Sequence, residues 1–278
     1  MLNRKNKKTN NVYNEGAKLR RLIWKLSVND FKKKFAGSYL GMTWAFIQPI
    51  VMVFLYWFVF EKFMGQSKAQ ILGTGLEVPY VIYLIAGMVP WFFFSDAITG
   101  ATSALVEYNY LVKKVVFKIS ILPIIKIISA MFVHIFFVVF LLLFTWIGYG
   151  MAPTIYTIQV IYYTVCLFIF VLGISYASSA IVIFFKDLTQ IIAILLQVGM
   201  WGTPILWQIS MVPEKWRILF KLNPVYYVVN GYRASIFEQK WFFEDCYFTI
   251  YFWLVTLLIF IAGRSMFKRL KVHFADVL

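Results

Sequence analysis

The sequence predicts an all-α polytopic membrane protein with six transmembrane helices. Residues 39–60 run for 22 positions without an acidic or basic side chain, and five similar segments follow. A helix of that length spans the roughly 30 Å hydrocarbon core of a bilayer. Hydrophobic residues make up 62% of the chain and charged residues only 14%, whereas soluble domains have about 25% charged residues. Because backbone polar groups inside a bilayer must be satisfied within their own segment, each run is expected to be helical.

The chain divides into a basic N-terminal segment, residues 1–38, and a transmembrane domain, residues 39–278. Nineteen Lys and Arg residues fall on the side of the two termini and seven on the other side. Positive residues stay on the cytoplasmic side, so both termini are predicted to be cytoplasmic. The net charge of +15 comes from these Lys and Arg residues beside the spans, so it does not indicate nucleic-acid binding. The predicted spans are residues 39–60, 80–105, 119–148, 155–185, 189–208 and 246–263.

Before the first span, residues 18–26 have the pattern of an amphipathic helix. Leu19, Leu22, Ile23 and Leu26 recur at helical spacing on one face, and basic residues lie off that face. Such a helix is suited to lying in the membrane interface. It is either a charged anchor or a gate helix that meets the phosphates of lipid or substrate at the cytoplasmic entrance. The basic residues of this predicted entrance are Arg20, Arg21, Lys25, Lys32, Lys33 and Lys34.

The longest connection, residues 209–245, is too apolar for a solvated loop and too interrupted to span the membrane. Proline lacks an N–H and biases the preceding residue away from the helical conformation, so Asn223–Pro224 should separate two short helices. Non-helical backbone at membrane depth must be buried in protein or line a wet cavity. This region is therefore predicted either to be re-entrant beside a translocation path or to form a packed cap on the surface.

Three charged or histidine side chains lie inside predicted spans. Asp96 should face the bundle or water, or be protonated, because a carboxylate in hydrocarbon is costly. It serves either a polar path or a structural hydrogen bond between helices. Lys126 is close enough to the cytoplasmic end of its span to snorkel to the interface. His134 is expected to be an interhelical hydrogen-bond partner.

The sequence contains no P-loop motif G-x-x-x-x-G-K-[ST] and no H-E-x-x-H or Cys/His metal spacing. His134 in a span and His273 in the basic tail are poor candidates for a Ser-His-Asp triad. Cys166 and Cys246 do not imply a disulfide framework. We therefore expect no enzyme activity, metal or cofactor in the isolated chain. Uphill transport would need energy from a partner or from an ion gradient.

Several segments resemble the membrane subunit of ABC-2 type exporters, in the group that exports lipid-linked polysaccharides and teichoic acids. Ser38, Leu40–Gly41, Trp44 and Pro49 are similar to the family's entrance pattern S-x-L-G-x-x-W-x-x-x-x-P. Residues 87–94, Gly-Met-Val-Pro-Trp-Phe-Phe-Phe, resemble its G-x-x-P-W-x-F-F pattern. The resemblance extends over the chain from about residue 15.

The resemblance also implies roles for particular residues. Residues 107–118 look like the family's first coupling helix, which docks on a separate P-loop ATPase, and residues 185–188 look like its second cytoplasmic turn. The residues implied in ATPase coupling are Asn109, Leu111, Lys113, Lys114, Phe117 and Asp187. Those implied in the translocation path are Trp44, Trp91 and Asp96, and those in the outer re-entrant region are Asn223, Pro224, Tyr227 and Arg233.

The resemblance further implies a homodimer of this subunit in the bacterial plasma membrane, above two copies of an ATPase that binds ATP and Mg²⁺. ATP-driven closure of the ATPase would push the coupling helices and open a path between the two permease copies. The expected cargo is a polyprenyl-diphosphate-linked polymer, and the Lys/Asn-rich start of the chain looks most like the wall teichoic acid branch of Gram-positive bacteria. The alternatives are capsule or O-antigen export, then small-molecule efflux, then a membrane-embedded polyprenol-lipid transferase.

Overall fold

A computed structural model describes residues 2–71, 75–114 and 117–277, with side chains described outside residues 2–15, 275 and 276. Helices dominate the described chain, as the sequence predicted. The described strands form one antiparallel hairpin, β1 (Lys68–Gln70) with β2 (Glu77–Pro79), which the sequence did not predict.

Five helical stretches are long and apolar enough to cross a membrane, and they correspond to predicted spans one to four and six. The first begins with a 3₁₀ turn (Gly41–Thr43), continues as α2 (Trp44–Trp57) and ends in a π turn (Phe58–Phe63). The last extends beyond the predicted end at residue 263. The other long helices and the helix that ends the chain are α3 (Tyr80–Glu107), α5 (Leu122–Tyr149), α6 (Gln159–Ile181), α10 (Cys246–Leu270) and α11 (Phe274–Val277).

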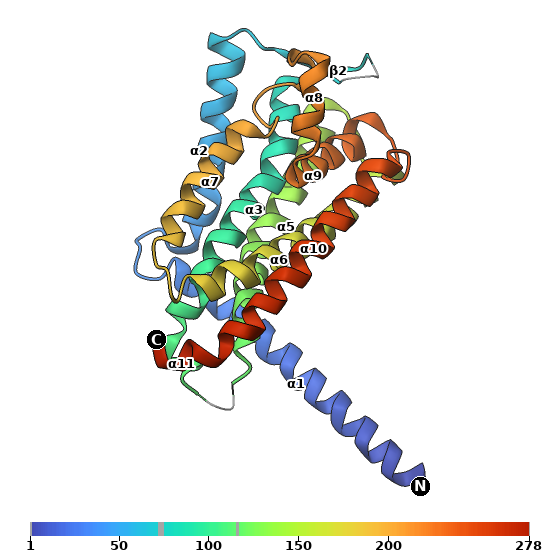
Figure 1. The fold of residues 1–278 in the computed structure, drawn as a ribbon. Helices are drawn as coiled ribbons and strands as arrows, with labels where there is room; N and C mark the ends of the chain where they lie inside the picture. The colour runs from blue at the N-terminus through green and yellow to red at the C-terminus, as the bar shows by residue number, and fades with distance from the viewer. Residues whose placement is uncertain (1, 72–74, 115–116, 278) are drawn as a thin grey trace.

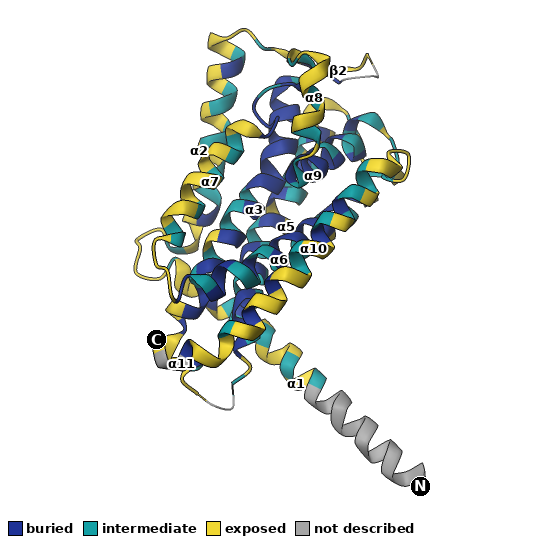
Figure 2. Ribbon diagram, in the orientation of Figure 1, coloured by how far each residue is buried: buried dark blue, intermediate teal, exposed yellow. Residues whose placement is uncertain are grey.

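The central helix of the bundle is α3. In its most apolar 18-residue stretch, 83% of the residues are buried, compared with 17% in the stretch containing α10 and 11% in the one containing α2. It packs against α2, α5, α6, α7 and α9, and Figures 1 and 2 show it enclosed by these neighbours. The helices α2 and α10 therefore leave broad apolar faces for lipid or for another chain.

Two glycines bring α6 and α10 into close contact. A Cβ atom on Gly263 would lie 2.2 Å from the backbone oxygen of Gly173, and one on Gly173 would lie 3.0 Å from the backbone of Phe260. Small residues at such a crossing allow the backbones of two membrane helices to approach each other. A larger side chain at Gly263 would force the two helices apart.

The predicted fifth span, residues 189–208, is not one continuous helix. The helix α7 (Leu188–Gly202) has 15 residues, which makes it about 22 Å long and shorter than the hydrocarbon core. Residues 203–208 continue as mostly buried, non-helical backbone. The Thr203-Pro204 sequence explains where the helix ends, because proline disfavours the helical conformation at the residue before it.

A single helix, α1 (Leu2–Lys34), contains the predicted amphipathic segment and the basic run that precedes the first span. Leu19, Ile23 and Leu26 pack against the bundle, whereas Leu22 is 40% exposed. The apolar face of this helix is therefore narrower than the sequence predicted.

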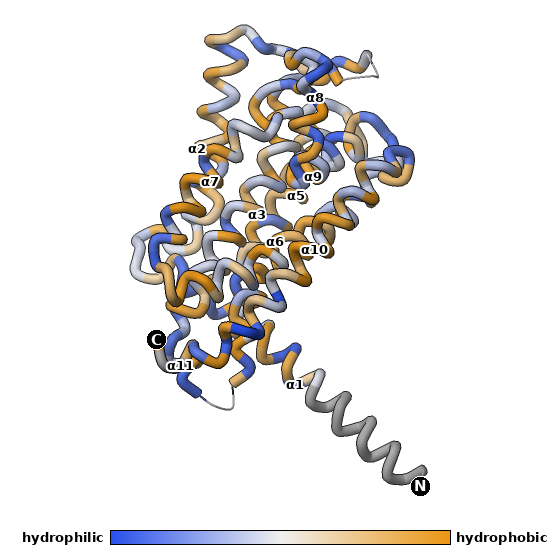
Figure 3. The backbone as a smooth tube through the Cα atoms, viewed as in Figure 1, coloured by the Kyte–Doolittle hydropathy of each residue, from blue (hydrophilic) through white to orange (hydrophobic). Residues whose placement is uncertain are grey.

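The two ends of the bundle carry different short elements. One end holds α4 (Asn109–Val112), the C-terminus and the Lys34 end of α1. The opposite end holds the hairpin, α8 (Glu214–Lys221) and α9 (Pro224–Arg233), which meet at Asn223–Pro224 where the sequence predicted a break. We name these the inner and outer ends, following the orientation predicted from the sequence. Hydrophilic residues gather toward both ends, and hydrophobic residues follow the long helices between them (Figure 3).

Candidate transport groove and coupling surface

A groove that has charged side chains among largely apolar walls lies toward the inner end, between α1, α3 and α5. It consists of two adjoining cavities of about 390 and 350 Å³, which share Lys34, Asp96, Thr99 and Ala130 in their walls. The first cavity reaches α2 and α7 and is also lined by Gln48, Pro49, Trp91, Phe92, His134 and Met200. The second is also lined by Asp30, Lys33, Glu107, Tyr108, Lys126 and Ser129.

Asp96 on α3 forms an ion pair with Lys34 at the end of α1. The side chains of Asp96 and Lys34 are 38% and 45% exposed, so the pair lies on the surface of the groove. Sequence alone left open whether Asp96 serves a polar path or links two helices. In the structure it links α1 to α3 and also lines both cavities. Exposed pairs contribute at most about 1 kcal/mol to stability, so folding alone does not account for this carboxylate.

A second group of charges, the Lys126 cluster, is formed by Asp30, Glu107, Tyr108 and Lys126. The Nζ atom of Lys126 lies 2.8 Å from Oδ1 of Asp30 and 2.5 Å from Oε2 of Glu107. The hydroxyl of Tyr108 donates a hydrogen bond to the same oxygen of Asp30 at 2.7 Å. The side chain of Lys126 is only 12% exposed. Its ammonium group, which was predicted to snorkel toward the inner end, is held by two carboxylates, and one of them, Glu107, is 51% exposed at the end of α3.

The Lys126 cluster joins three segments. Asp30 belongs to α1, Glu107 and Tyr108 directly precede α4, and Lys126 belongs to α5. Sequence analysis did not identify Asp30, Glu107 or Tyr108 as candidate site residues. The signal that could have found them was Lys126 itself, because a charge inside a span normally pairs with an opposite charge.

Of the three residues predicted to line the translocation path, Trp91 and Asp96 line the groove and Trp44 does not. Trp91 is buried and lines the groove, and a Cβ atom on Gly199 of α7 would lie 3.0 Å from its indole ring. Trp44 is 44% exposed at the start of α2. His134 is buried, with Nε2 lying 2.9 Å from the hydroxyl oxygen of Tyr232. This contact is the interhelical hydrogen bond expected for His134.

The predicted entrance residues are exposed along α1. Lys33 lines the second cavity of the groove, and Lys34 lines both cavities. Positive charge therefore continues along α1 to the groove. The exposed residues are Arg20, Arg21, Lys25, Lys32, Lys33 and Lys34.

The predicted coupling surface lies at the inner end (Figure 1). The helix α4 has only four residues, fewer than the predicted segment 107–118, because α3 continues to Glu107. Leu111 and Phe117 are partly buried against the apolar cluster beneath them. Residues 115–116 of this segment lie outside the described residues. The exposed members are Asn109, Lys113, Lys114 and, in the turn before α7, Asp187.

At the outer end, buried Arg233 holds the backbone that follows α7. Its Nη1 donates to the carbonyl of Pro204 at 2.7 Å and its Nη2 to the carbonyl of Ile205 at 2.9 Å. Its Nε donates to the carbonyl of Tyr83 at 3.3 Å, and its Cζ lies 3.5 Å from the centre of the Tyr83 ring. A Cβ atom on Gly87 would lie 2.6 Å from Nη2, so only glycine leaves room for the guanidinium.

The other predicted outer residues also contact neighbouring helices. Asn223 accepts a hydrogen bond from a backbone N–H in the first turn of α9 and donates to Thr203 at 2.8 Å. Pro224 occupies the first position of α9, where a missing N–H has no consequence. Tyr227 is buried and stacks on Phe252 of α10. These contacts fix α9 against the end of α7 and against α10.

The fold and the groove define a polytopic helical membrane protein with a charged, partly enclosed route at one end. Among the described residues, no group of three His, Cys, Asp or Glu side chains could hold a metal ion. Residues 21–237 match the ABC-2 type transporter family, and the chain belongs to that family. A permease of this family is the transmembrane subunit of its transporter and not itself the ATPase.

The chain is similar over most of its length to curated permeases. It is 25% identical over 261 residues to an O-antigen export system permease protein, RfbA, of Klebsiella pneumoniae, and 26% identical to a second RfbA of that species. It is 25% identical over 259 residues to RfbA of Myxococcus xanthus. Each alignment covers 92% of this chain and 95% of the relative.

Proposed function

We propose that the chain is the permease subunit of an ABC exporter that moves a polyprenyl-diphosphate-linked polysaccharide to the outer face of the bacterial plasma membrane. The groove is the observation that carries this proposal. Exposed basic residues are spread along α1, and Lys33 and Lys34 at its end line cavities whose walls combine charged, polar and aromatic side chains. A diphosphate with a polar polymer needs such a route, whereas a hydrophobic small molecule does not. A separate P-loop ATPase would bind ATP and Mg²⁺ and contact Lys113, Lys114 and Asp187.

The relatives favour an O-antigen type of polysaccharide over wall teichoic acid, which was the main prediction from the sequence. All three relatives named above are O-antigen export permeases. The prediction of teichoic acid depended on the overall pattern of the motifs and on the Lys/Asn-rich start of the chain, residues 3–11, whose side chains lie outside those described. We therefore place the substrate among the lipid-linked polysaccharides.

A second copy of this chain is proposed to cover the exposed side of α2 and α7. These helices lie side by side, since the hydroxyl of Tyr56 contacts the sulfur of Met200 at 3.9 Å. Gln190 and Gln197 are exposed on one face of α7. Carboxamides that face lipid would leave donors and acceptors unsatisfied, whereas a second subunit or a hydrated path would satisfy them. The groove reaches the same side through Gln48 and Met200.

The proposed topology keeps six crossings and cytoplasmic termini. In it, α7 and residues 203–208 together make the fifth crossing. The helices α8 and α9 then form the re-entrant outer region, and Arg233 of α9 satisfies the non-helical backbone of the fifth crossing at Pro204 and Ile205.

Affinity purification of the tagged chain in mild detergent, followed by mass spectrometry, tests the class. We expect a stoichiometric P-loop ATPase, and its absence from intact, folded protein would contradict the proposal. Depletion of the chain in its host tests the substrate. Lipid-linked polysaccharide should accumulate on the cytoplasmic side and disappear from the surface. Accumulation of a polyol-phosphate polymer instead would restore the teichoic acid alternative.

A further inference from the structure

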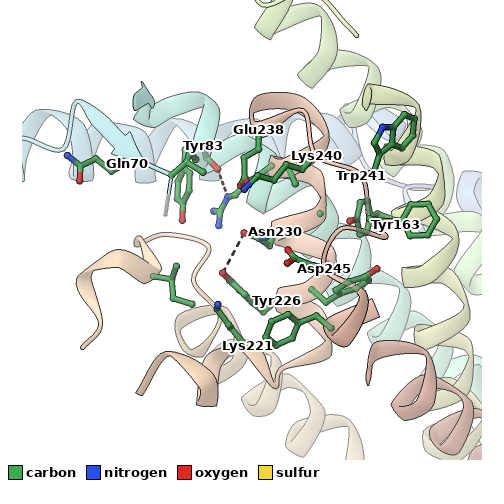
Figure 4. A pocket seen from close by; sticks show the side chains of 18 residues that line it. Gln70, Tyr83, Tyr163, Lys221, Tyr226, Asn230, Glu238, Lys240, Trp241 and Asp245 are labelled. Carbon is green, nitrogen blue, oxygen red and sulfur yellow. Dashed lines mark hydrogen bonds and ion pairs between the residues drawn. The ribbon is translucent and has the colours of Figure 1, made fainter. Parts of the chain in front are cut away.

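We infer that the outer end carries a binding pocket for one saccharide unit of the exported polymer, separate from the groove. This inference rests on the proposed function, because polysaccharide export would deliver the ligand to this face. A cavity of about 320 Å³ lies there between the hairpin, α8, α9 and the connection from α9 to α10 (Figure 4). This volume is at the lower end of the range for ligand pockets, which suits a ligand of one or two sugar rings.

Polar side chains from several elements converge on this cavity. Tyr226 and Asn230 lie one turn apart on α9 and point into it, with the Tyr226 hydroxyl 3.5 Å from the Asn230 side-chain oxygen (Figure 4). Together they offer a hydroxyl and a carboxamide, which can both donate and accept hydrogen bonds. Further polar groups in the wall are Lys221, Glu238, Lys240 and Asp245.

Aromatic rings make up much of the remaining wall. Tyr163 of α6 and Tyr227 of α9 pack edge to face with their centres 5.4 Å apart. Trp241 and Phe242 follow from the connection to α10, and both are only partly buried. A sugar ring presents C–H groups on its faces and hydroxyls around its rim. Aromatic faces with hydrogen-bonding groups around them therefore match it in both respects.

The backbone beside this cavity has an unfavourable conformation that places the side chains of Glu238 and Lys240 in the cavity wall. Residues 234–238 form a π turn, and Gln239 has a left-handed conformation with φ of 54°. Single π turns and left-handed non-glycine residues cluster at functional sites because neither is favourable by itself. Here they bring Glu238 and Lys240 to the same wall, with 3.6 Å between the carboxylate and the ammonium group.

The two ammonium groups of the wall are matched by two carboxylates, and its guanidinium group is engaged by backbone carbonyls, which argues for an uncharged ligand. Lys221 and Lys240 are matched by Glu238 and Asp245. Arg233 also borders the cavity, but each of its three nitrogens already donates to a backbone carbonyl. A diphosphate would meet as many carboxylates as ammonium groups here. Hydroxyls can donate to the carboxylates and accept from the ammonium groups, so a neutral saccharide satisfies both kinds of group.

Saturation-transfer NMR on the full chain in nanodiscs of phosphatidylglycerol and phosphatidylethanolamine tests the inference. The probes are methyl glycosides of glucose, galactose, mannose, rhamnose and N-acetylglucosamine. We expect at least one to bind, and Asn230→Ala and Glu238→Gln each to weaken its binding about fivefold to tenfold. Tyr247→Leu is the matched control, because Tyr247 is 90% exposed directly after the same connection and does not line the cavity. Its affinity should equal that of the wild type.

Three results would overturn the inference. One is the absence of binding by every glycoside to protein that exports polysaccharide in its host. Another is equal affinity of the wild type, Asn230→Ala and Glu238→Gln, with both variants folded. The third is binding only to nanodiscs containing a glycosylated diacylglycerol, which would make the ligand a membrane lipid. None of these three results contradicts the proposed export function. Normal export of polysaccharide in a host lacking the chain would contradict that function, and it is a separate measurement from the binding experiment.

Discussion

The Nη1 atom of Arg233 donates a hydrogen bond to the carbonyl oxygen of Pro204 at 2.7 Å. This contact explains how α7 can end at Gly202 without leaving unsatisfied backbone inside the bundle. The carbonyl of Ile205 is also taken by Arg233, and that of Leu206 accepts from the Tyr80 hydroxyl at 2.6 Å. A charge that the sequence placed in an apolar loop thus replaces the hydrogen bonds that a continuous helix would have made.

Replacing Arg233 with lysine should lower the melting temperature of the protein. An ammonium group cannot reproduce the planar fork that reaches three carbonyls. At least one buried carbonyl would lose its partner, at a cost of about 1–3 kcal/mol. Arg217→Lys is the control, because Arg217 also donates to two carbonyls but belongs to the partly exposed α8. Melting temperatures that fall equally in the two variants would contradict a special role for Arg233.

The Lys126 cluster predicts non-additive mutations. Lys126→Met leaves the buried carboxylate of Asp30 without its cation and should cost about 3–5 kcal/mol in the free energy of unfolding. Asp30→Asn should cost less, because Lys126 keeps Glu107 as a partner. The double variant should lose less free energy of unfolding than the sum of the losses in the two single variants, since both substitutions remove the same interaction. Denaturant titration in detergent measures all three, and strict additivity would show that the pair is not coupled.

Asp96→Asn should separate stability from transport. Its ion pair with Lys34 is exposed, so the melting temperature should change by the equivalent of less than about 1 kcal/mol. Export of lipid-linked polysaccharide should nevertheless fall, because the substitution changes the charge of both cavities of the groove. Glu214→Gln, an exposed acid on α8 at the outer end, is the control and should export normally. Full export by Asp96→Asn would remove this residue from the path.

Glu238 predicts a pH dependence of stability. Burial raises its pKa above the usual 4.5, helped by Asp245 and opposed by Lys240 and Arg233. The folded state therefore holds this proton more tightly than the unfolded chain. Its stabilising effect is complete below the ordinary pKa and is lost as the pH rises through the raised pKa. Glu238→Gln should therefore melt at a higher temperature than the wild type at neutral pH, with the difference vanishing near pH 4.5. A constant difference across that range would be inconsistent with the raised pKa.

The sequence predicted the long helices well because bilayer thickness fixes the length of an apolar run. It also singled out Asp96, since a charge in an apolar segment is costly enough to need a purpose, and the family resemblance pointed to Arg233. Their partners could not be predicted in the same way. Lys34 and Pro204 become partners only through the rotation and crossing of helices, which no periodicity in the chain reports. For the same reason the partners of Lys126 were missed.

Reversing Lys113 and Lys114 to glutamate should uncouple ATP hydrolysis from export without unfolding the bundle. Both side chains are exposed directly after α4, so replacing them with glutamate disrupts no buried contact. Glu107 and Tyr108 directly precede α4 and are joined through the Lys126 cluster to α1 and α5. A push on α4 by the ATPase is therefore expected to move α1 and the groove with it. ATPase activity and polysaccharide export, measured together in proteoliposomes, test this. Reversing Lys268 and Arg269, exposed at the inner end of α10, provides the control. Normal export by Lys113→Glu/Lys114→Glu, or an equal loss in the control, would place the docking surface elsewhere.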